Sequence, residues 1–354
     1  MNRTAIAVMA AAAWAATALP AASCNAASDP LTVVTTTTDL KSLVEAVGGD
    51  RVRATSVACG YEDPHFVQAK PSYMMTAREA DLWVRIGMEL EIGWEELLLD
   101  GSRNPRIRIG APGHMDASEG VLRLEVPSVR VTRELGDIHP LGNPHYWLDP
   151  LNGRIVAKAI ADRLAQLRAS DADTFRKNLA AFTAALDTRM FGPELVRQVG
   201  GDSLWAMAVK GNLGDFLNQH NLTAKLGGWL GRMRPWRGTR IVTYHRSWSY
   251  FANRFGMVVA AELEPKPGVP PSPAHVATVV ERMKADGIKV VLMEPFYSRK
   301  SADFVAAKTG ATVLVCPNSV GGEKEAADYL ALIDLIVDRL DQALGGQAPA
   351  QGKG

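Results

Sequence analysis

The chain has 354 residues, which exceeds the usual size of a single hydrophobic core, so at least two lobes are expected. Hydrophobic residues make up 47% and charged residues 22% of the chain, which is typical of folded globular proteins and excludes a fully disordered chain. The 39 Lys and Arg residues nearly balance the 38 Asp and Glu residues, and a formal charge of +1 argues against a nucleic-acid partner.

The first residues have the pattern of a secretory signal peptide. Arg3 gives a short basic start, an uncharged stretch follows to Ala18, and small residues continue beyond it. This stretch is shorter than the roughly 20 apolar residues of a membrane-spanning helix, so we predict that residues 1–23 are a signal peptide and that the mature chain is periplasmic. Lipid anchoring at Cys24 is the alternative, although the residues before it match a lipidation signal poorly.

Residues 31–150 are predicted to form an N-terminal lobe. Short apolar segments alternate there with amphipathic ones, which predicts βα units around a mostly parallel sheet. Asp39 is expected to cap the first helix, and Gly48 and Gly49 to end it. The predicted strands are residues 31–36, 52–57, 82–86, 106–109 and 121–126, and the predicted helices are residues 39–47 and 71–80.

Residues 151–237 are predicted to connect this lobe to a second one. Helical spacing of apolar residues from 151 to 186, broken near Asp171, predicts two helices, of which the second serves as a rigid connector. Residues 191–237 contain glycines and three tryptophans but only fragments of helical periodicity. We interpret this segment as an insertion or an elaborated linker.

Residues 238–345 repeat the βα pattern and are predicted to form a C-terminal lobe of the same class. Ser272 followed by Pro273 is a typical helix start. The glycine-rich tail, residues 346–354, is expected to be disordered. The predicted strands are residues 240–244, 257–263, 288–293 and 312–315, and the predicted helices are residues 248–255, 273–287, 298–308 and 323–344.

Three histidines lie in loops expected to face one cleft. His65 follows the second predicted strand, His145 precedes the connector, and His245 directly follows the strand that ends at Tyr244. Ligands of open α/β lobes bind where strands end at their carboxyl side. Neutral imidazole is a common ligand of zinc-like ions, so the three histidines together predict a metal site, although a loop histidine bonded to backbone or water is the alternative for each. His139, in the loop that leads to His145, is interpreted first as a solvated loop residue, with an auxiliary ligand as the alternative.

Two further residues end strands of the second lobe. Glu294 is either a fourth ligand or a carboxylate that accepts backbone N–H groups. Cys316 is interpreted first as a small buried apolar residue. With Cys24 and Cys59 it makes only three cysteines, which allow at most one disulfide.

Several motifs together resemble the metal-binding solute-binding proteins of ABC transporters for zinc and manganese, the cluster A-I type. The resemblance runs from about Leu31 to Leu344. No single motif is specific, but their order along the chain is. The motifs are Leu31-Thr-Val-Val-Thr-Thr36, Asp63-Pro64-His65, Asn143-Pro-His-Tyr-Trp-Leu-Asp-Pro150, Thr243-Tyr-His-Arg-Ser-Trp-Ser-Tyr250, Met293-Glu294-Pro295 and Thr309-Gly310-Ala311.

The resemblance implies two βα lobes bridged by a long helix, with the ion held between the lobes and delivered to a membrane permease. It implies that His65 and His145 are ligands and that His245 stands at the place of the third. The fourth ligand of that family is usually an aspartate after the last strand, but residues 315–322 contain no carboxylate. The candidates for the fourth position are Glu294, Cys316, Glu62 and water.

The chain also departs from the family in two places. It lacks a long histidine- and aspartate-rich loop before His145, where it has only Asp137, Ile138 and His139. The segment 191–237 is longer than the usual connection. Both differences bear on how metal is transferred and on which ion is carried.

Our leading hypothesis is a monomeric periplasmic receptor that captures a divalent transition metal and presents it to an ABC importer. Zinc is the first choice and manganese the second, because three imidazoles without an assured carboxylate suit a tetrahedral, borderline-soft ion. The alternative is a secreted zinc-dependent hydrolase with Glu294 as base, although no nucleophile elbow, P-loop or dinucleotide fingerprint supports an enzyme. A third reading, an adhesin or scaffold that retains only the fold, predicts no tight metal site.

Overall fold

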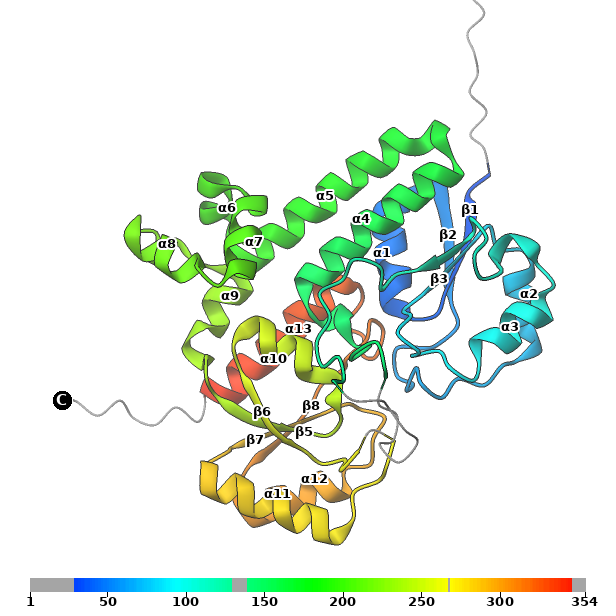
Figure 1. Cartoon of the computed structure of the whole chain (residues 1–354). Helices are drawn as coiled ribbons and strands as arrows, with labels where there is room; N and C mark the ends of the chain where they lie inside the picture. The colour runs from blue at the N-terminus through cyan, green and yellow to red at the C-terminus, as the bar shows by residue number, and fades with distance from the viewer. Residues whose placement is uncertain (1–28, 129–138, 267, 346–354) are drawn as a thin grey trace, which may run out of the picture.

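Two four-stranded parallel sheets organise the chain, whose computed structural model describes residues 29–128, 139–266 and 268–345 (Figure 1). The predicted α/β class with two sheets is confirmed. The predicted signal peptide, Cys24 and the tail lie outside the described residues. Within the described part, no helix is long and apolar enough to cross a membrane.

The two sheets share one topology, in which the first strand of each lies between the second and the third. The first sheet has the order β2-β1-β3-β4 and the second has the order β6-β5-β7-β8. The strands are β1 (Leu31–Thr35), β2 (Val52–Ser56), β3 (Leu82–Arg85), β4 (His114–Asp116), β5 (Arg240–Thr243), β6 (Val258–Glu262), β7 (Val290–Met293) and β8 (Thr312–Val315).

Alternation along the strands divides the apolar side chains between faces. Val33 packs into the largest core cluster, whereas its neighbour Val34 packs on the opposite face of β1, against α2 (Pro71–Arg78) and α3 (Glu95–Ser102). A parallel sheet covered on both faces requires this pattern. The largest cluster also takes residues from β5 and β7, so one continuous core joins the two lobes.

The first lobe corrects three sequence predictions. Thr37, not Asp39, caps α1 (Thr38–Gly48), because the Thr37 side chain accepts a hydrogen bond from the Leu40 N–H. Residues 106–109 form no strand, since Pro105 begins a 3₁₀ turn there. Residues 121–126 form no strand either, because the N–H groups of Leu122 and Leu124 bond to side chains of other elements. The fourth strand is β4 instead, and α3 was not predicted.

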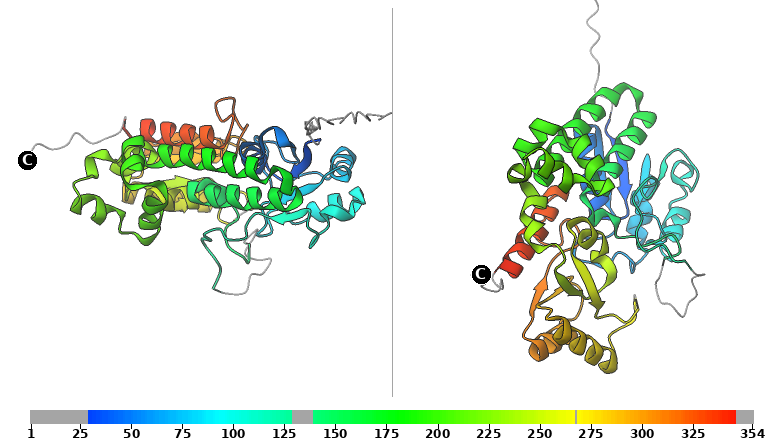
Figure 2. Two further views of the ribbon diagram at one scale, coloured as in Figure 1. Left: turned by 90° about the horizontal axis from the view of Figure 1, so that it is seen from above. Right: turned by 60° about the vertical axis from the view of Figure 1, so that its left-hand side comes forward.

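Two long helices leave the first lobe side by side. They are α4 (Pro150–Leu167) and α5 (Ala172–Phe191), separated by a 3₁₀ turn where the sequence predicts the break. Figure 2 shows these green helices and the red α13 running along the length of the molecule.

Residues 193–233, which sequence periodicity left unassigned, are largely helical. Gly192, Gly200 and Gly211, which have positive φ, separate the short helices and interrupt the periodic pattern. This group of helices lies at the end of α5 that is farther from the first sheet (Figure 1). They are α6 (Pro193–Val199), α7 (Gly201–Lys210), α8 (Leu213–Gln219) and α9 (Gly228–Met233).

The helices of the second lobe follow the prediction except at the last one. α10 (Ser249–Phe255), α11 (Pro273–Asp286) and α12 (Lys300–Thr309) lie close to their predicted positions, and Ser272 caps α11 as expected. α13 (Tyr329–Gly345) begins six residues later than predicted. The segment before it returns to the first lobe, where the Val320 N–H donates to Asp39 and the Tyr329 N–H to Ser42.

The segment 143–150 is fixed between the two lobes by polar contacts. The Trp147 Nε1–H donates to the Asn318 carbonyl at 2.7 Å, and the Tyr250 hydroxyl donates to the Asn143 carbonyl at 2.8 Å. Asp149 forms two 2.7 Å bonds with Arg254, and both side chains are buried. These bonds hold the His145 backbone in a defined place between the sheets.

Candidate metal centre

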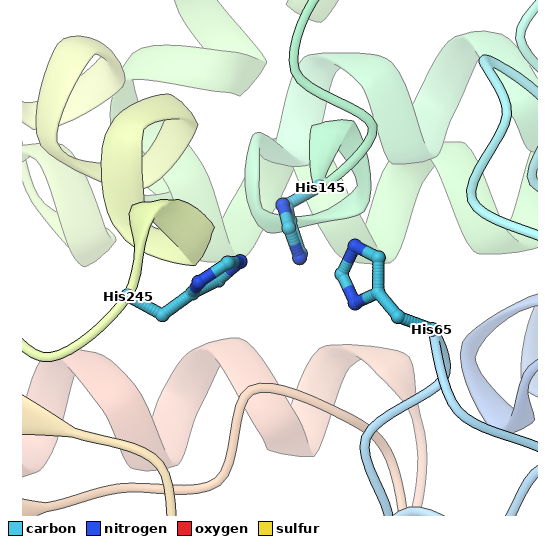
Figure 3. A group of neighbouring side chains, drawn as sticks. All are labelled: His65, His145 and His245. Carbon is cyan, nitrogen blue, oxygen red and sulfur yellow. The ribbon is translucent and has the colours of Figure 1, made fainter. Parts of the chain in front are cut away.

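His65, His145 and His245 converge on one point, as the strand-end rule predicts. One ring nitrogen from each lies within 4.8 Å of the others, and the three ring centroids are 5.2–5.7 Å apart. His65 comes from the loop after β2, His145 from the loop before α4, and His245 lies two residues after the end of β5. Figure 3 shows the three rings pointing toward one another from these segments. The arrangement can supply three nitrogen ligands to a single ion.

Each of the three rings is oriented by an oxygen at its Nδ1 atom. Asp63 lies 2.7 Å from His65 Nδ1, Asn143 lies 2.8 Å from His145 Nδ1, and Glu264 lies 2.6 Å from His245 Nδ1. With Nδ1 occupied, Nε2 is the nitrogen left for a ligand bond on every ring. Such partners fix the tautomer and orientation of metal-binding imidazoles.

A short repeated motif builds two of these pairs. The two motifs are Asp63-Pro64-His65 and Asn143-Pro144-His145. In each, the side-chain oxygen of the first residue accepts a hydrogen bond from the histidine backbone N–H at 3.0 Å. The same oxygen also contacts the Nδ1 atom of the histidine ring. This is an Asx turn, in which a short polar side chain hydrogen-bonds the backbone two residues later. The repeat is visible in the sequence, but sequence reasoning gave no role to Asp63 or Asn143. Glu264 is 19 positions from its histidine and carries no sequence signal.

Burial and charge set different protonation behaviour on the rings. Burial, together with repulsion from the neighbouring histidines, holds the pKa of His145 well below its usual value. Burial alone would also lower the pKa of His245, but the hydrogen bond to Glu264 and the charge of Glu294 outweigh it and raise that pKa. Burial would raise the pKa of Asp63, yet its bond to His65 keeps the pKa below the ordinary value. The site therefore has a neutral ring beside anionic partners.

His139 lies against the site rather than free in solvent. Its ring stacks on His65 at 5.5 Å, and its Nε2 atom is buried with no hydrogen-bond partner in the described part of the chain. Burial and the charges of His65 and His245 lower its pKa to about 3. A fourth neutral imidazole thus borders the three, so the first interpretation of His139 as a solvated loop residue is wrong.

Glu294 is buried close enough to the site to interact with it electrostatically. Burial raises its pKa to about 7, opposed mainly by the charge of His245. Neither carboxylate oxygen has a hydrogen bond of standard geometry within the described residues, although weaker interactions with the Ser247 side chain and the backbone of Glu294 itself lower the pKa. The group of ligand atoms within 4.8 Å comprises the three histidines without Glu294.

The two other sequence candidates are engaged elsewhere. Cys316 is fully buried in the main core, and burial raises the pKa of its thiol to about 12. This agrees with its interpretation as an apolar residue, because a thiolate is the form that binds metal. The Glu62 carboxylate accepts a 3.4 Å bond from the Cys59 N–H. Cys59 and Cys316 are both free thiols.

A cavity of about 310 Å³ opens beside the histidines. His65, His245 and their partners Asp63 and Glu264 line it. Tyr297, whose hydroxyl donates to Asp63 at 3.2 Å, contributes to its wall. The cavity therefore borders two of the three rings, and His145 does not line it.

Comparison with known proteins identifies the family. The family model described as zinc-uptake complex component A, periplasmic, matches residues 33–189 and 230–343, which is well over half of the chain. The chain belongs to this family. The manganese ABC transporter substrate-binding lipoprotein PsaA of Streptococcus pneumoniae is 23% identical over 325 residues, and the match covers 91% of each chain.

Two further matches cover nearly the whole chain. The iron-binding protein YfeA of Yersinia pestis is 24% identical, and the match covers 88% of this chain and 86% of that protein. A crystal structure of ZnuA has a TM-score of 0.66 and 23% identity, and it covers 89% of this chain and 99% of the other. Together with the family match, these findings confirm the resemblance to metal-binding solute-binding proteins. They show that the chain is the substrate-binding component of a metal ABC importer. They support that function over a secreted hydrolase.

Proposed function

We propose that this chain binds one divalent metal ion through His65, His145 and His245 and presents it to the permease of an ABC importer. The observation that carries the proposal is that three imidazoles from both lobes face one point while an oxygen holds each Nδ1. An arrangement of this kind leaves three Nε2 atoms available at once. Structural loop histidines have no need to converge in this way.

Zinc is the ion that this set of ligands fits best, with manganese second. Three nitrogens and one further position match the tetrahedral preference of zinc, whereas manganese favours more oxygen ligands. The relatives are named for manganese and iron as well as zinc, so family membership alone leaves the ion open.

We propose Glu294 for the fourth position, with water as the alternative. Glu294 is fully buried and has no hydrogen bond of standard geometry within the described residues, so its charge is costly unless a cation compensates it. Coordination requires a shift of the ion or of the carboxylate, because Glu294 lies outside the group of three. Replacement with Gln would then weaken binding but leave the three imidazoles in place.

The chain is further proposed to act in the periplasm as a monomer. The sequence of residues 1–23 supports export, and the family description names a periplasmic component. The permease is the membrane partner that this role requires.

Calorimetric titration of the metal-free mature chain with zinc and with manganese tests the proposal. We expect one-to-one binding of both ions, with the tighter dissociation constant for zinc. If neither ion binds tightly, the receptor role is refuted. If manganese binds more tightly than zinc, only the choice of ion is refuted.

Zinc affinity is expected to fall as the pH falls from 7.5 to 5.5. Only neutral imidazole binds the ion, so each proton taken up competes with it. Because the pKa of His245 is raised, this ring gains its proton at a higher pH than an ordinary histidine does. Below that pKa one competing proton weakens binding by about tenfold per pH unit. Zinc titrations at pH 7.5, 6.5 and 5.5 measure the effect, and an unchanged dissociation constant would contradict it.

Glu264→Ala is expected to weaken zinc binding by about 10- to 100-fold, which is typical when the partner of a metal-binding imidazole is removed. The physical reason is that His245 loses the 2.6 Å bond that orients its ring. Glu264→Gln keeps an acceptor and should have a smaller effect. Glu281→Ala, an exposed residue of α11, is the matched control. Equal affinities for Glu264→Ala and this control would refute the positioning role.

A further inference from the structure

A second cavity, of about 530 Å³, lies among the helices after α5. It shares no lining residue with the cavity beside the histidines. Most of its wall comes from residues 190–230, and the family match leaves residues 190–229 uncovered. The volume falls within the range of about 300–1,000 Å³ that is typical of small-molecule pockets. This part of the chain therefore adds a cavity that the metal-binding role does not use.

Much of the cavity wall is apolar. Leu213 and Leu217 of α8 line it, together with Leu230 of α9 and Leu226 just before that helix. Met190, at the end of α5, is fully buried beneath them. A water-filled cavity with such a wall leaves apolar surface exposed, so an apolar group entering it would be stabilised.

The charged residues of the wall are all cations. Arg254 already binds Asp149. Arg234 and Arg237, from the segment after α9, are exposed and form no side-chain hydrogen bond or ion pair within the described residues. Among the residues that the structure describes, none that lines the cavity is acidic. Two unpaired guanidinium groups beside an apolar wall favour an anionic head group, since arginine binds carboxylates and phosphates through paired hydrogen bonds.

We propose that this cavity binds a small single-chain amphiphile, with its apolar chain against the leucines of α8 and α9 and its anionic head on Arg234 and Arg237. Binding of an amphiphile needs both the apolar wall and the two unpaired arginines. Neither feature takes part in the metal site or in the contacts between the lobes. The inference is independent of which ion the histidines bind.

Calorimetric titration of the full mature chain with three ten-carbon probes tests the proposal. The probes are decanoate, decyl phosphate and 1-decanol, each kept below the concentration at which it aggregates. We expect saturable one-to-one binding of at least one anion, and at least about tenfold weaker binding of the uncharged alcohol. The stronger of the two anions identifies the head group as a carboxylate or a phosphate.

Two variants locate the binding. The double substitution Arg234→Ala and Arg237→Ala should weaken binding of the anion by at least about tenfold. Ala208→Phe, which places a ring in the cavity, should abolish binding. Arg299→Ala, at an exposed residue just before α12, is the matched control and should change nothing. Retained zinc binding shows that each variant is folded.

The proposal is overturned if neither anion binds saturably, or if 1-decanol binds as tightly as the anions. Anion binding unaffected by both the double arginine substitution and Ala208→Phe would also overturn it. The comparison of probes on the unaltered chain remains decisive if a variant fails to fold.

Discussion

Replacing His65, His145 and His245 together with Ala is expected to abolish tight zinc binding. Each substitution removes one nitrogen ligand, and structural zinc sites bind with about 10–16 kcal/mol in total. One ligand of four therefore contributes roughly 3 kcal/mol, so His145→Ala alone should weaken binding by at least about a hundredfold. Calorimetry with a competing chelator measures both effects.

His220→Ala is the matched control for these substitutions. His220 is exposed at the end of α8, so its replacement should leave the zinc affinity of the chain unchanged. Far-ultraviolet circular dichroism should be unchanged in all variants. Tight zinc binding retained in the triple variant would contradict the assignment of the site.

Asp149→Ala is expected to lower the free energy of unfolding by about 3–5 kcal/mol. The substitution leaves the guanidinium of Arg254 buried without its two 2.7 Å bonds, and an uncompensated buried charge has a cost of that size. Asp149 also caps α4 by accepting the Leu151 N–H at 2.9 Å, a contact worth about 1 kcal/mol. Urea unfolding followed by tryptophan fluorescence measures the loss.

Two companion variants separate these contributions. Asp149→Asn keeps an acceptor for the cap and removes only the charge, so it should recover about 1 kcal/mol relative to Asp149→Ala. Combining Asp149→Ala with Arg254→Met removes both charges and should recover part of the remaining loss. A loss below about 1 kcal/mol in Asp149→Ala would refute the role of this ion pair.

The fold class and the three histidines could be predicted because local patterns determine them. Apolar segments at the strand positions indicate parallel sheets, and the carboxyl ends of such strands form the binding edge. His245 lies two residues after the end of β5, so that rule places it without any long-range information. By contrast, residues 121–126 have the composition of a strand, yet the N–H groups of Leu122 and Leu124 bond to Asn152 and Tyr250. Only tertiary structure decides between those partners and a sheet.

The remaining features of the site depend on contacts between distant parts of the chain. Glu264 meets His245 because β6 runs beside β5, and the Glu264 N–H bonds to the Tyr244 carbonyl. The stacking of His139 on His65 likewise joins residues 74 positions apart. No periodicity or spacing encodes such pairs. The repeated Asx-Pro-His motif is the one local signal that could have indicated oriented imidazoles.

X-ray absorption spectroscopy of the zinc-loaded chain tests the central claim most directly, because it reports the ligand atoms themselves. We expect three imidazole nitrogens at about 2.0–2.1 Å and one oxygen ligand. We further expect that one imidazole is lost from the spectrum of His145→Ala. A spectrum with fewer than two imidazoles, or one dominated by sulfur at about 2.3 Å, would contradict the proposed site.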